Sequence, residues 1–529
     1  MTHKEKKKMK LWKKIVIAVL IIVVLIAIAG FVILRTLFSQ SPISTAKGSA
    51  KAVVQTENGK IRGSIENSIY QYLGVPYAEV GERFVPAEDV KKWNGVKDAT
   101  STGAMSPQSG MLGMSAGNQE GTDNNCQNLN IWTPGIQDGK KRAVMVWLHG
   151  GGFSTGSAND ELYNGKDLSK SGDVVVVSVN HRLGASGFLD LSAYDKKYQY
   201  SGNVGLTDIV KALEWIHNNI EEFGGDPKNV TLFGQSGGGA KVLAMMTSPY
   251  AKGLFQRGIV ESGATETMGV TFSSQEASTY LTERILDKLG ITKDHIEDIQ
   301  KTDWEKLEDV SQEALQETAD KFQIPAPLSD GNAMEWGPVV DGDYIPTNPV
   351  TEESFAENGK DIELLIGSNL NEWTGMMGGN QGDMTEEETA AFKEAYPDKD
   401  ASKANKVDTL IRLPMLKIMS HKADQGGAET YAYVFTWDKA PIRGAYHGAE
   451  IPFVFDHKQS SKTAQKLADQ ISRAWVNFAK TGVPSADGMP KWEAYDRKNG
   501  ATMLLDKNFT LVHGHDRKLM SLLKPDYQY

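Results

Sequence analysis

The sequence predicts an α/β fold in which helices flank a large, mostly parallel central sheet. Apolar runs of strand length at 143–148 and 173–180 have the continuous hydrophobicity of strands that are covered on both faces. Amphipathic helical patterns lie between such runs, and this alternation favours a parallel sheet. The chain has 529 residues, but residues 52–529 contain no internal repeat and no low-complexity linker, which favours one large domain.

The first predicted elements of this domain form a hairpin. Short apolar segments at Val53-Val54, Ile61 and Ile69-Tyr70 surround the pair Asn58-Gly59. Asn-Gly is favoured in type I′ turns because both turn residues need positive φ. We therefore expect a tight turn at Asn58-Gly59.

A helix is predicted over 206–223, after the second buried strand. Gly224 and Gly225 predict its end. Apolar residues recur at spacings of three and four, which places them on one helix face: Leu206, Ile209, Leu213, Ile216, Ile220 and Phe223. Further strands are predicted at 229–233, 258–261, 363–366 and 430–437, and further helices at 240–246, 274–289, 304–321, 384–395 and 463–480.

The N-terminal segment differs in charge from the rest of the chain. Residues 1–46 carry eight positive charges and one negative charge, whereas residues 47–529 carry 49 positive and 66 negative charges. Residues 15–34 form an uncharged apolar run that would be about 30 Å long as a helix, which is enough to cross a bilayer. Seven lysines precede this run. We therefore expect a cytoplasmic basic segment (1–14), a transmembrane anchor (15–34), a linker (35–51) and an extracellular domain (52–529).

A cleaved signal peptide is the alternative for the N-terminal segment. Ser44-Thr45-Ala46 offers a weak cleavage site, and cleavage would make the protein secreted. The apolar region of a signal peptide usually has about 7–15 residues, and this run is longer and is closed by Arg35. We therefore favour an uncleaved anchor in the cell membrane.

Overall composition excludes several classes of protein. A net charge of −10 argues against nucleic-acid binding, which needs a basic surface. Cys126 is the one cysteine, so the chain has neither an intramolecular disulfide nor a cysteine-based metal cluster. No feature of the sequence predicts an oligomeric state.

Gly234-Gln235-Ser236-Gly237-Gly238 fits the pattern G-x-S-x-G. The motif lies between the predicted strand 229–233 and the predicted helix 240–246. A sharp turn from strand to helix crowds its flanks, so glycine is needed on both sides of the serine. The turn also projects the serine hydroxyl away from the backbone. Ser236 is therefore the predicted nucleophile.

A second glycine-rich loop, His149-Gly150-Gly151-Gly152-Phe153, follows the predicted strand 143–148. Without side chains, its backbone N–H groups can approach a negative charge that develops on a substrate oxygen. We predict an oxyanion hole made by the N–H groups of Gly151 and Gly152, together with that of Gly237 after the nucleophile.

A serine nucleophile needs a base, and the residues alone leave five candidates: His181, His447, His457, His513 and His515. When serine lies on such a strand-to-helix turn, the chain order is serine, acid, histidine, with the histidine in a loop after a late strand. His447 follows the predicted strand 430–437 by ten residues, and Glu372 follows the predicted strand 363–366. Asp341 and Asp343 are the alternative acids.

Together these motifs resemble the type-B carboxylesterase/lipase family, the cholinesterase-like α/β-hydrolases. The similarity runs in family order from about residue 52 to the C-terminus, and its most specific stretches are VMVWLHGGGFSTGS, NVTLFGQSGGG, LLIGSNLNEWTG and GAYHGAEIPFVF. In architecture the chain is most similar to the bacterial para-nitrobenzyl-esterase-like carboxylesterases, because the stretch from the glutamate to the histidine is compact.

The resemblance implies an α/β-hydrolase fold and hydrolysis of small-molecule carboxylic esters through an acyl-enzyme. The implied catalytic residues are Ser236, Glu372 and His447, and the implied oxyanion donors are Gly151, Gly152 and Gly237. No metal or organic cofactor is implied.

Three positions depart from the family pattern. Gln235 occupies a position that is often acidic, and Gly237 replaces the usual alanine. Ser106 occupies the position of the cysteine that usually pairs with Cys126, so the loop 107–125 is expected to be less constrained. Cys126 itself is expected to be a buried apolar residue.

Two other kinds of function remain open. Some members of the family have lost the triad and act as extracellular adhesion modules, but all three triad positions are occupied here. The motifs also describe acyl transfer without defining the leaving group, so a thioesterase, an amidase or a lactone hydrolase would use the same site.

Overall fold

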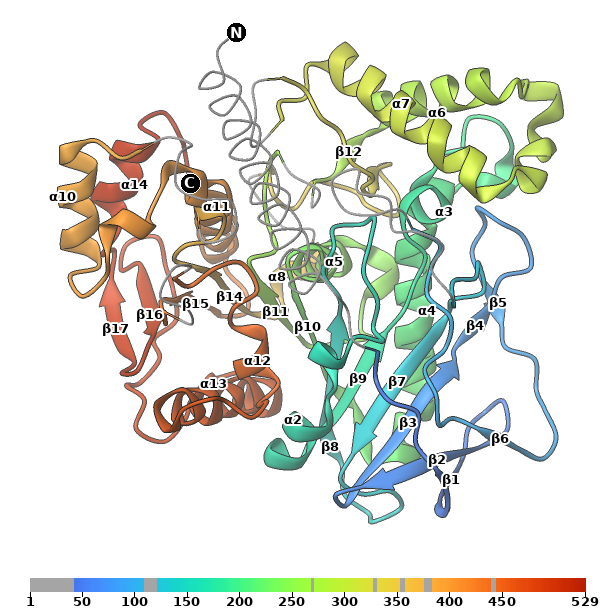
Figure 1. The fold of residues 1–529 in the computed structure, drawn as a ribbon, viewed down its shortest axis with the longest axis horizontal. Helices are drawn as coiled ribbons and strands as arrows, with labels where there is room; N and C mark the ends of the chain where they lie inside the picture. The colour runs from blue at the N-terminus through green and yellow to red at the C-terminus, as the bar shows by residue number, and fades with distance from the viewer. Residues whose placement is uncertain are drawn as a thin grey trace, which may run out of the picture.

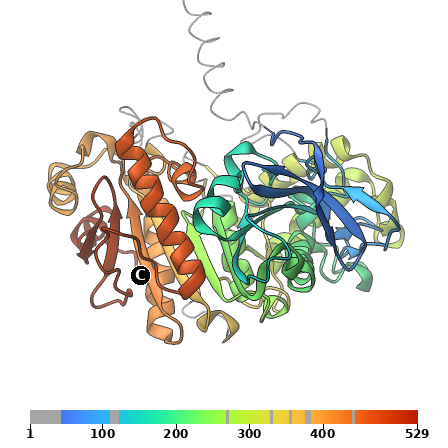
Figure 2. The same ribbon diagram turned by 90° about the horizontal axis from the view of Figure 1, so that it is seen from below.

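The computed structural model describes residues 42–108, 121–267, 271–326, 331–352, 357–374, 383–438 and 444–529. Within these ranges one large sheet runs through the molecule, and helices cover both of its faces (Figures 1 and 2). The helices in this part of the chain are all too short or too polar to cross a membrane. The predicted anchor at 15–34 lies outside the described residues.

The central sheet is mixed, with a parallel middle. Its strand order is β1-β2-β3-β7-β9-β8-β10-β11-β14-β15-β16-β17. The strands are β1 (Gly48–Gln55), β2 (Lys60–Glu66), β3 (Ile69–Pro76), β7 (Asn128–Thr133), β8 (Arg142–Leu148), β9 (Val175–Val179), β10 (Gly225–Gln235), β11 (Arg257–Glu261), β14 (Glu363–Asn369), β15 (Thr430–Phe435), β16 (Ala501–Leu505) and β17 (Thr510–His513). All neighbours from β9 to β16 are parallel.

Outside this middle, the neighbours in the strand order are antiparallel, and only the short strand β6 (Val96–Asp98) adds a parallel pair, beside β2. Short connections, as between β2 and β3 and between β16 and β17, allow only antiparallel pairing, whereas parallel neighbours need a long crossover. A tight turn joins β1 to β2 at the predicted place, since Gln55 pairs with Lys60 and the backbones of Thr56 and Gly59 are hydrogen-bonded to each other, but this turn is not of type I′. Asn67 and Ser68 have the two positive φ values (50° and 70°) and join β2 to β3, whereas Asn58 is not among the residues with positive φ.

Helices cover the two faces of the sheet with separate apolar clusters. The principal helices are α2 (Lys166–Gly172), α3 (Gly184–Phe188), α4 (Val204–Asn219), α5 (Gly237–Thr247), α6 (Gln275–Leu289), α7 (Trp304–Phe322), α10 (Glu386–Ala395), α11 (Thr409–Gln425), α12 (Ile451–Val454), α13 (Lys462–Thr481) and α14 (Arg517–Leu523). Along β8, Val146 belongs to the cluster shared with α4 and α5, and Trp147 to the cluster shared with α13. This alternation explains the continuous hydrophobicity of the strand.

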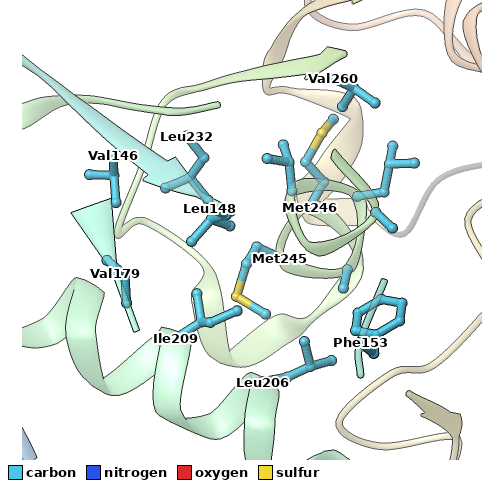
Figure 3. Close-up of a cluster of buried hydrophobic side chains, with 14 of the residues drawn as sticks. Val146, Leu148, Phe153, Val179, Leu206, Ile209, Leu232, Met245, Met246 and Val260 are labelled. Carbon is cyan, nitrogen blue, oxygen red and sulfur yellow. The ribbon is translucent and has the colours of Figure 1, made fainter. Parts of the chain in front are cut away.

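Helix α5 forms the centre of the first cluster. Figure 3 shows Met245 between the strand residues Val146 and Leu232 on one side and Ile209 of α4 on the other. The helix is buried along its whole length. Since α5 begins directly after Ser236, this packing fixes the position of the predicted nucleophile relative to the sheet.

Cys126 is a free, buried thiol, and Ser106 is also buried. Burial raises the pKa of the Cys126 thiol far above its usual range, and a hydrogen bond with the Ser106 side chain opposes this rise only in part. The thiol is therefore unreactive, as expected for a small apolar residue. The Ser106 side chain therefore lies near enough to the thiol to affect its pKa.

Ser106→Cys is expected to form a disulfide with Cys126. The bond would close a loop of about 20 residues, for which the loss of chain entropy in the unfolded state predicts a stabilisation of about 3 kcal/mol. Urea unfolding with and without dithiothreitol measures this effect, and Ser106→Ala is the matched control. Two titratable thiols in oxidised Ser106→Cys protein would show that the two side chains do not meet in a bonding geometry.

Candidate active site

The predicted site residues gather at one edge of the parallel part of the sheet. Strands β8, β10, β14 and β15 of its parallel part, with β11 between β10 and β14, lead directly or through loops to the predicted oxyanion loop, Ser236, Glu372 and His447. In open α/β sheets the carboxyl ends of parallel strands form the usual ligand site. The fold thus brings together four segments that are far apart in the sequence.

Ser236 lies on a strained turn between β10 and α5. Its φ and ψ are 56° and −127°, a conformation that is rare for a residue with a side chain, and its N–H donates to Glu261 O at 2.8 Å. A Cβ atom at Gly234 would collide with the backbone of Gly238, and one at Gly238 with the carbonyl oxygen of Leu148. The flanking glycines are therefore required, as the sequence predicts.

Glu372 and His447 are joined by a short hydrogen bond. His447 Nδ1 lies 2.6 Å from Glu372 Oε2. The other carboxylate oxygen, Oε1, accepts from Ser262 Oγ at 2.6 Å and from the backbone N–H of Asn369 at 2.7 Å. Glu372 is completely buried, and the imidazole stacks on Trp373 with 4.6 Å between ring centroids. These contacts fix the orientation of both side chains.

Gln235 contacts the other nitrogen of the His447 ring. Its side-chain Nε2 lies 3.2 Å from His447 Nε2. An amide nitrogen can only donate, so His447 Nε2 accepts here and Nδ1 carries the proton that faces Glu372. Among the described residues the structure records no hydrogen bond between Ser236 Oγ and His447. Such bonds are often long in enzymes without substrate.

The predicted oxyanion loop lies against the first turn of α5. Gly151 and Gly152 have φ values of 90° and 61°, and Gly152 contacts Gly237. Within the described ranges, no protein acceptor is recorded for the N–H groups of these three glycines. These three N–H groups, which have no recorded acceptor in the described part of the chain, thus lie beside the predicted nucleophile, where donors can stabilise an oxyanion.

The alternative bases and acids lie elsewhere. His181 stacks on His149, and His513 pairs with Glu493 at 3.0 Å. His457 bonds to Leu162 O, and His515 packs on Tyr396. Asp341 accepts from Asn203, and Asp343 accepts from Tyr200 and Tyr250.

Three acidic or polar neighbours of the predicted triad were missed in the sequence. Ser262 follows β11 directly, so its place at a strand end between β10 and β14 was a usable signal. Glu261 and Glu450 are completely buried. Burial and the charge of Glu372 raise the pKa of Glu450 to about 7, and burial, together with Glu450, raises that of Glu261 well above its usual range.

In the described part of the chain, no cluster of three or more His, Cys, Asp or Glu side chains is arranged to hold a metal ion.

An α/β sheet that presents a serine turn, a glycine loop and a Glu–His pair at its carboxyl edge defines a class of serine hydrolases. The model of the carboxylesterase family matches residues 50–407 and 398–521. The chain therefore belongs to the carboxylesterase family and is a carboxylesterase with the α/β-hydrolase fold.

Characterised relatives cover almost the whole chain. The para-nitrobenzyl esterase of Bacillus subtilis (strain 168) is 34% identical over 504 residues, which are 89% of this chain and 98% of the relative. The phenmedipham hydrolase of Pseudarthrobacter oxydans is 31% identical over 86% of this chain and 95% of its own. A solved structure of a Clostridium hathewayi esterase, described as able to hydrolyse aliphatic aromatic polyesters, has a TM-score of 0.80 at 30% identity and covers 92% of this chain and 100% of its own.

Proposed function

We propose that the protein hydrolyses small carboxylic esters in two steps, with Ser236 as nucleophile, His447 as general base and Glu372 as the acid that orients the imidazole. The observation that carries the proposal is the hydrogen bond between Glu372 and His447, whose other ring nitrogen contacts Gln235, the residue next to Ser236 on the same turn. Without substrate, the Gln235 amide donates a hydrogen bond to His447 Nε2. In the proposed mechanism this amide moves aside so that Ser236 Oγ can donate to the same nitrogen.

In the first step, His447 Nε2 takes the proton of Ser236 while Oγ attacks the ester carbonyl carbon. The N–H groups of Gly151, Gly152 and Gly237 hold the negative oxygen that forms. Glu372, buried and fully hydrogen-bonded, stabilises the imidazolium. His447 then gives its proton to the leaving alcohol, and an acyl-serine remains.

In the second step, water attacks the acyl-serine. His447 takes a proton from this water, and the same three N–H groups hold the second oxyanion. Collapse of this intermediate returns the proton to Ser236 and releases the carboxylic acid. No metal or organic cofactor takes part in either step.

Labelling with a fluorophosphonate tests the proposed nucleophile, because the probe modifies only an activated serine. We expect one labelled peptide, containing Ser236, and turnover of short-chain p-nitrophenyl esters. A folded protein that neither reacts with the probe nor cleaves esters would favour an adhesion module. Rates for the ester, thioester and amide of one acyl group then define the leaving group.

We also propose that residues 15–34 anchor the enzyme in the cell membrane with the catalytic domain outside. The support is the length of the apolar run and the seven lysines ahead of it. Full-length protein is expected in the carbonate-washed membrane fraction, whereas a chain that begins at residue 47 is not. Release of a product that begins near residue 47 from full-length protein would identify a cleaved signal peptide instead.

A further inference from the structure

Lys241 is a completely buried lysine beside the predicted oxyanion hole. Its Nζ donates to the carbonyl oxygens of His149 and Gly152, both at 2.9 Å. The third side of the amine faces the ring of Phe153, 5.7 Å from the ring centroid. All three partners belong to the glycine loop, so Lys241 contacts both ends of the segment that carries Gly151.

The geometry of α5 explains how a lysine reaches this loop. Lys241 follows Gly237 by four residues, so the two residues lie on the same helix face. Helical side chains lean toward the N-terminus, which brings the amine back to the first turn. There Gly237 is in backbone contact with Gly152. The Lys241 side chain thus lies beside the point where the glycine loop contacts the first turn of α5.

The surroundings of Lys241 make this placement costly. None of the ion pairs among the described residues includes it, and burial lowers its pKa to about 7. The titratable groups that face it are His149 and His181, and the charge of Lys241 lowers the pKa of both imidazoles further. A methionine would fill the same space without a buried polar group, so the two hydrogen bonds are the distinctive property of lysine here.

We propose that Lys241 is a positioning residue of the oxyanion hole: by binding the carbonyl groups on both sides of Gly150-Gly151, it holds the glycine loop against α5 so that the N–H groups of Gly151, Gly152 and Gly237 converge on one point. The inference rests on the proposed ester hydrolysis. It differs from that proposal because it concerns the support of the donors rather than the donors themselves.

The test compares Lys241→Met with Lys422→Met. Lys422 is an equally buried lysine on α11 that donates to the carbonyl groups of Lys360 and Ala428, away from the glycine loop. The two variants therefore lose the same chemical groups. Rates are expressed per active site, counted by fluorophosphonate titration, so that partial unfolding does not count as lost catalysis.

A trifluoromethyl ketone measures the oxyanion hole directly. Ser236 Oγ bonds to the ketone carbon, its proton passes to His447, and the carbonyl electron pair becomes an oxyanion in the hole. Lys241→Met is expected to lower kcat/KM and the affinity for this ketone by the same factor of about 10–100, since loss of a whole donor costs about 100–1,000-fold. Affinity for the corresponding methyl ketone, which stays uncharged, should change less than about twofold.

Equal ketone affinity and equal kcat/KM in wild type and Lys241→Met would overturn the inference, and so would an equal loss in Lys422→Met. Should Lys241→Met not fold, Lys241→Gln serves, because its side chain is too short to reach both carbonyl groups. Unchanged values in that variant count against the inference in the same way. A wild-type protein that neither cleaves esters nor binds the trifluoromethyl ketone would overturn the proposed function and this inference together.

Discussion

Ser236→Ala is expected to lower kcat/KM for a short-chain ester by about a thousandfold or more, as other triad deletions do. Without Oγ the acyl-enzyme cannot form, and the strained turn offers no other nucleophile at this point. The residual rate would come from the oxyanion hole and substrate binding. Initial rates with a p-nitrophenyl ester measure the loss, and circular dichroism checks the fold.

Ser262→Ala is the matched control for this change. Its buried hydroxyl donates to Glu372 Oε1, and in the variant Asn369 N–H still binds the same oxygen. We expect a loss of about tenfold or less, in line with a single supporting hydrogen bond. Near-normal turnover in Ser236→Ala protein would contradict the proposed nucleophile.

Glu372→Gln is expected to lower kcat by about 10³–10⁴-fold, the size seen when a triad acid becomes an amide. Glu372 now accepts hydrogen bonds from three donors, His447 Nδ1, Ser262 Oγ and Asn369 N. A glutamine has one oxygen and one NH₂ group, so at least one of these donors would face another donor. The imidazole then turns its proton toward Ser236 and cannot act as a base.

Asp343→Asn is the control for Glu372→Gln. The two aspartates that the sequence left as alternative acids lie away from His447, and Asp343 accepts from Tyr200 and Tyr250. The same change of carboxylate to amide should therefore alter kcat by only a few-fold, since no reacting group is touched. A larger loss in Asp343→Asn than in Glu372→Gln would reassign the acid.

The sequence predicts best what depends on short-range pattern. The parallel strands are continuous apolar runs, α4 has a single apolar face, and the glycines around Ser236 follow from crowding at one turn. Helix α11 was missed because it is buried on nearly all sides and contains Pro414, so no one-sided pattern remains. The conformation of each turn depends on which residues pair across the two strands that it joins, and the sequence pattern does not show this pairing. Asn67-Ser68 rather than Asn58-Gly59 therefore has the two positive φ values of a type I′ turn.

Side-chain contacts between segments that are distant in the sequence could not be predicted from local sequence patterns. The Gln235 amide meets His447 only because β10 and the loop after β15 end at the same edge of the sheet. Lys241 gave no signal because a lysine in a helical pattern normally indicates a solvent-exposed face. Conversely, His181, His457, His513 and His515 looked equivalent to His447 until their neighbours were known.

The strand order has a consequence for biosynthesis. From β8 through β10, β11, β14 and β15 to β16, each strand is added beside one that the ribosome has already released. The oxyanion loop and the serine turn emerge first, and His447 comes some two hundred residues later. Domains fold as units during synthesis, so a nascent chain acquires its nucleophile long before the base that activates it. The nascent enzyme is therefore expected to have no esterase activity until the chain is nearly complete.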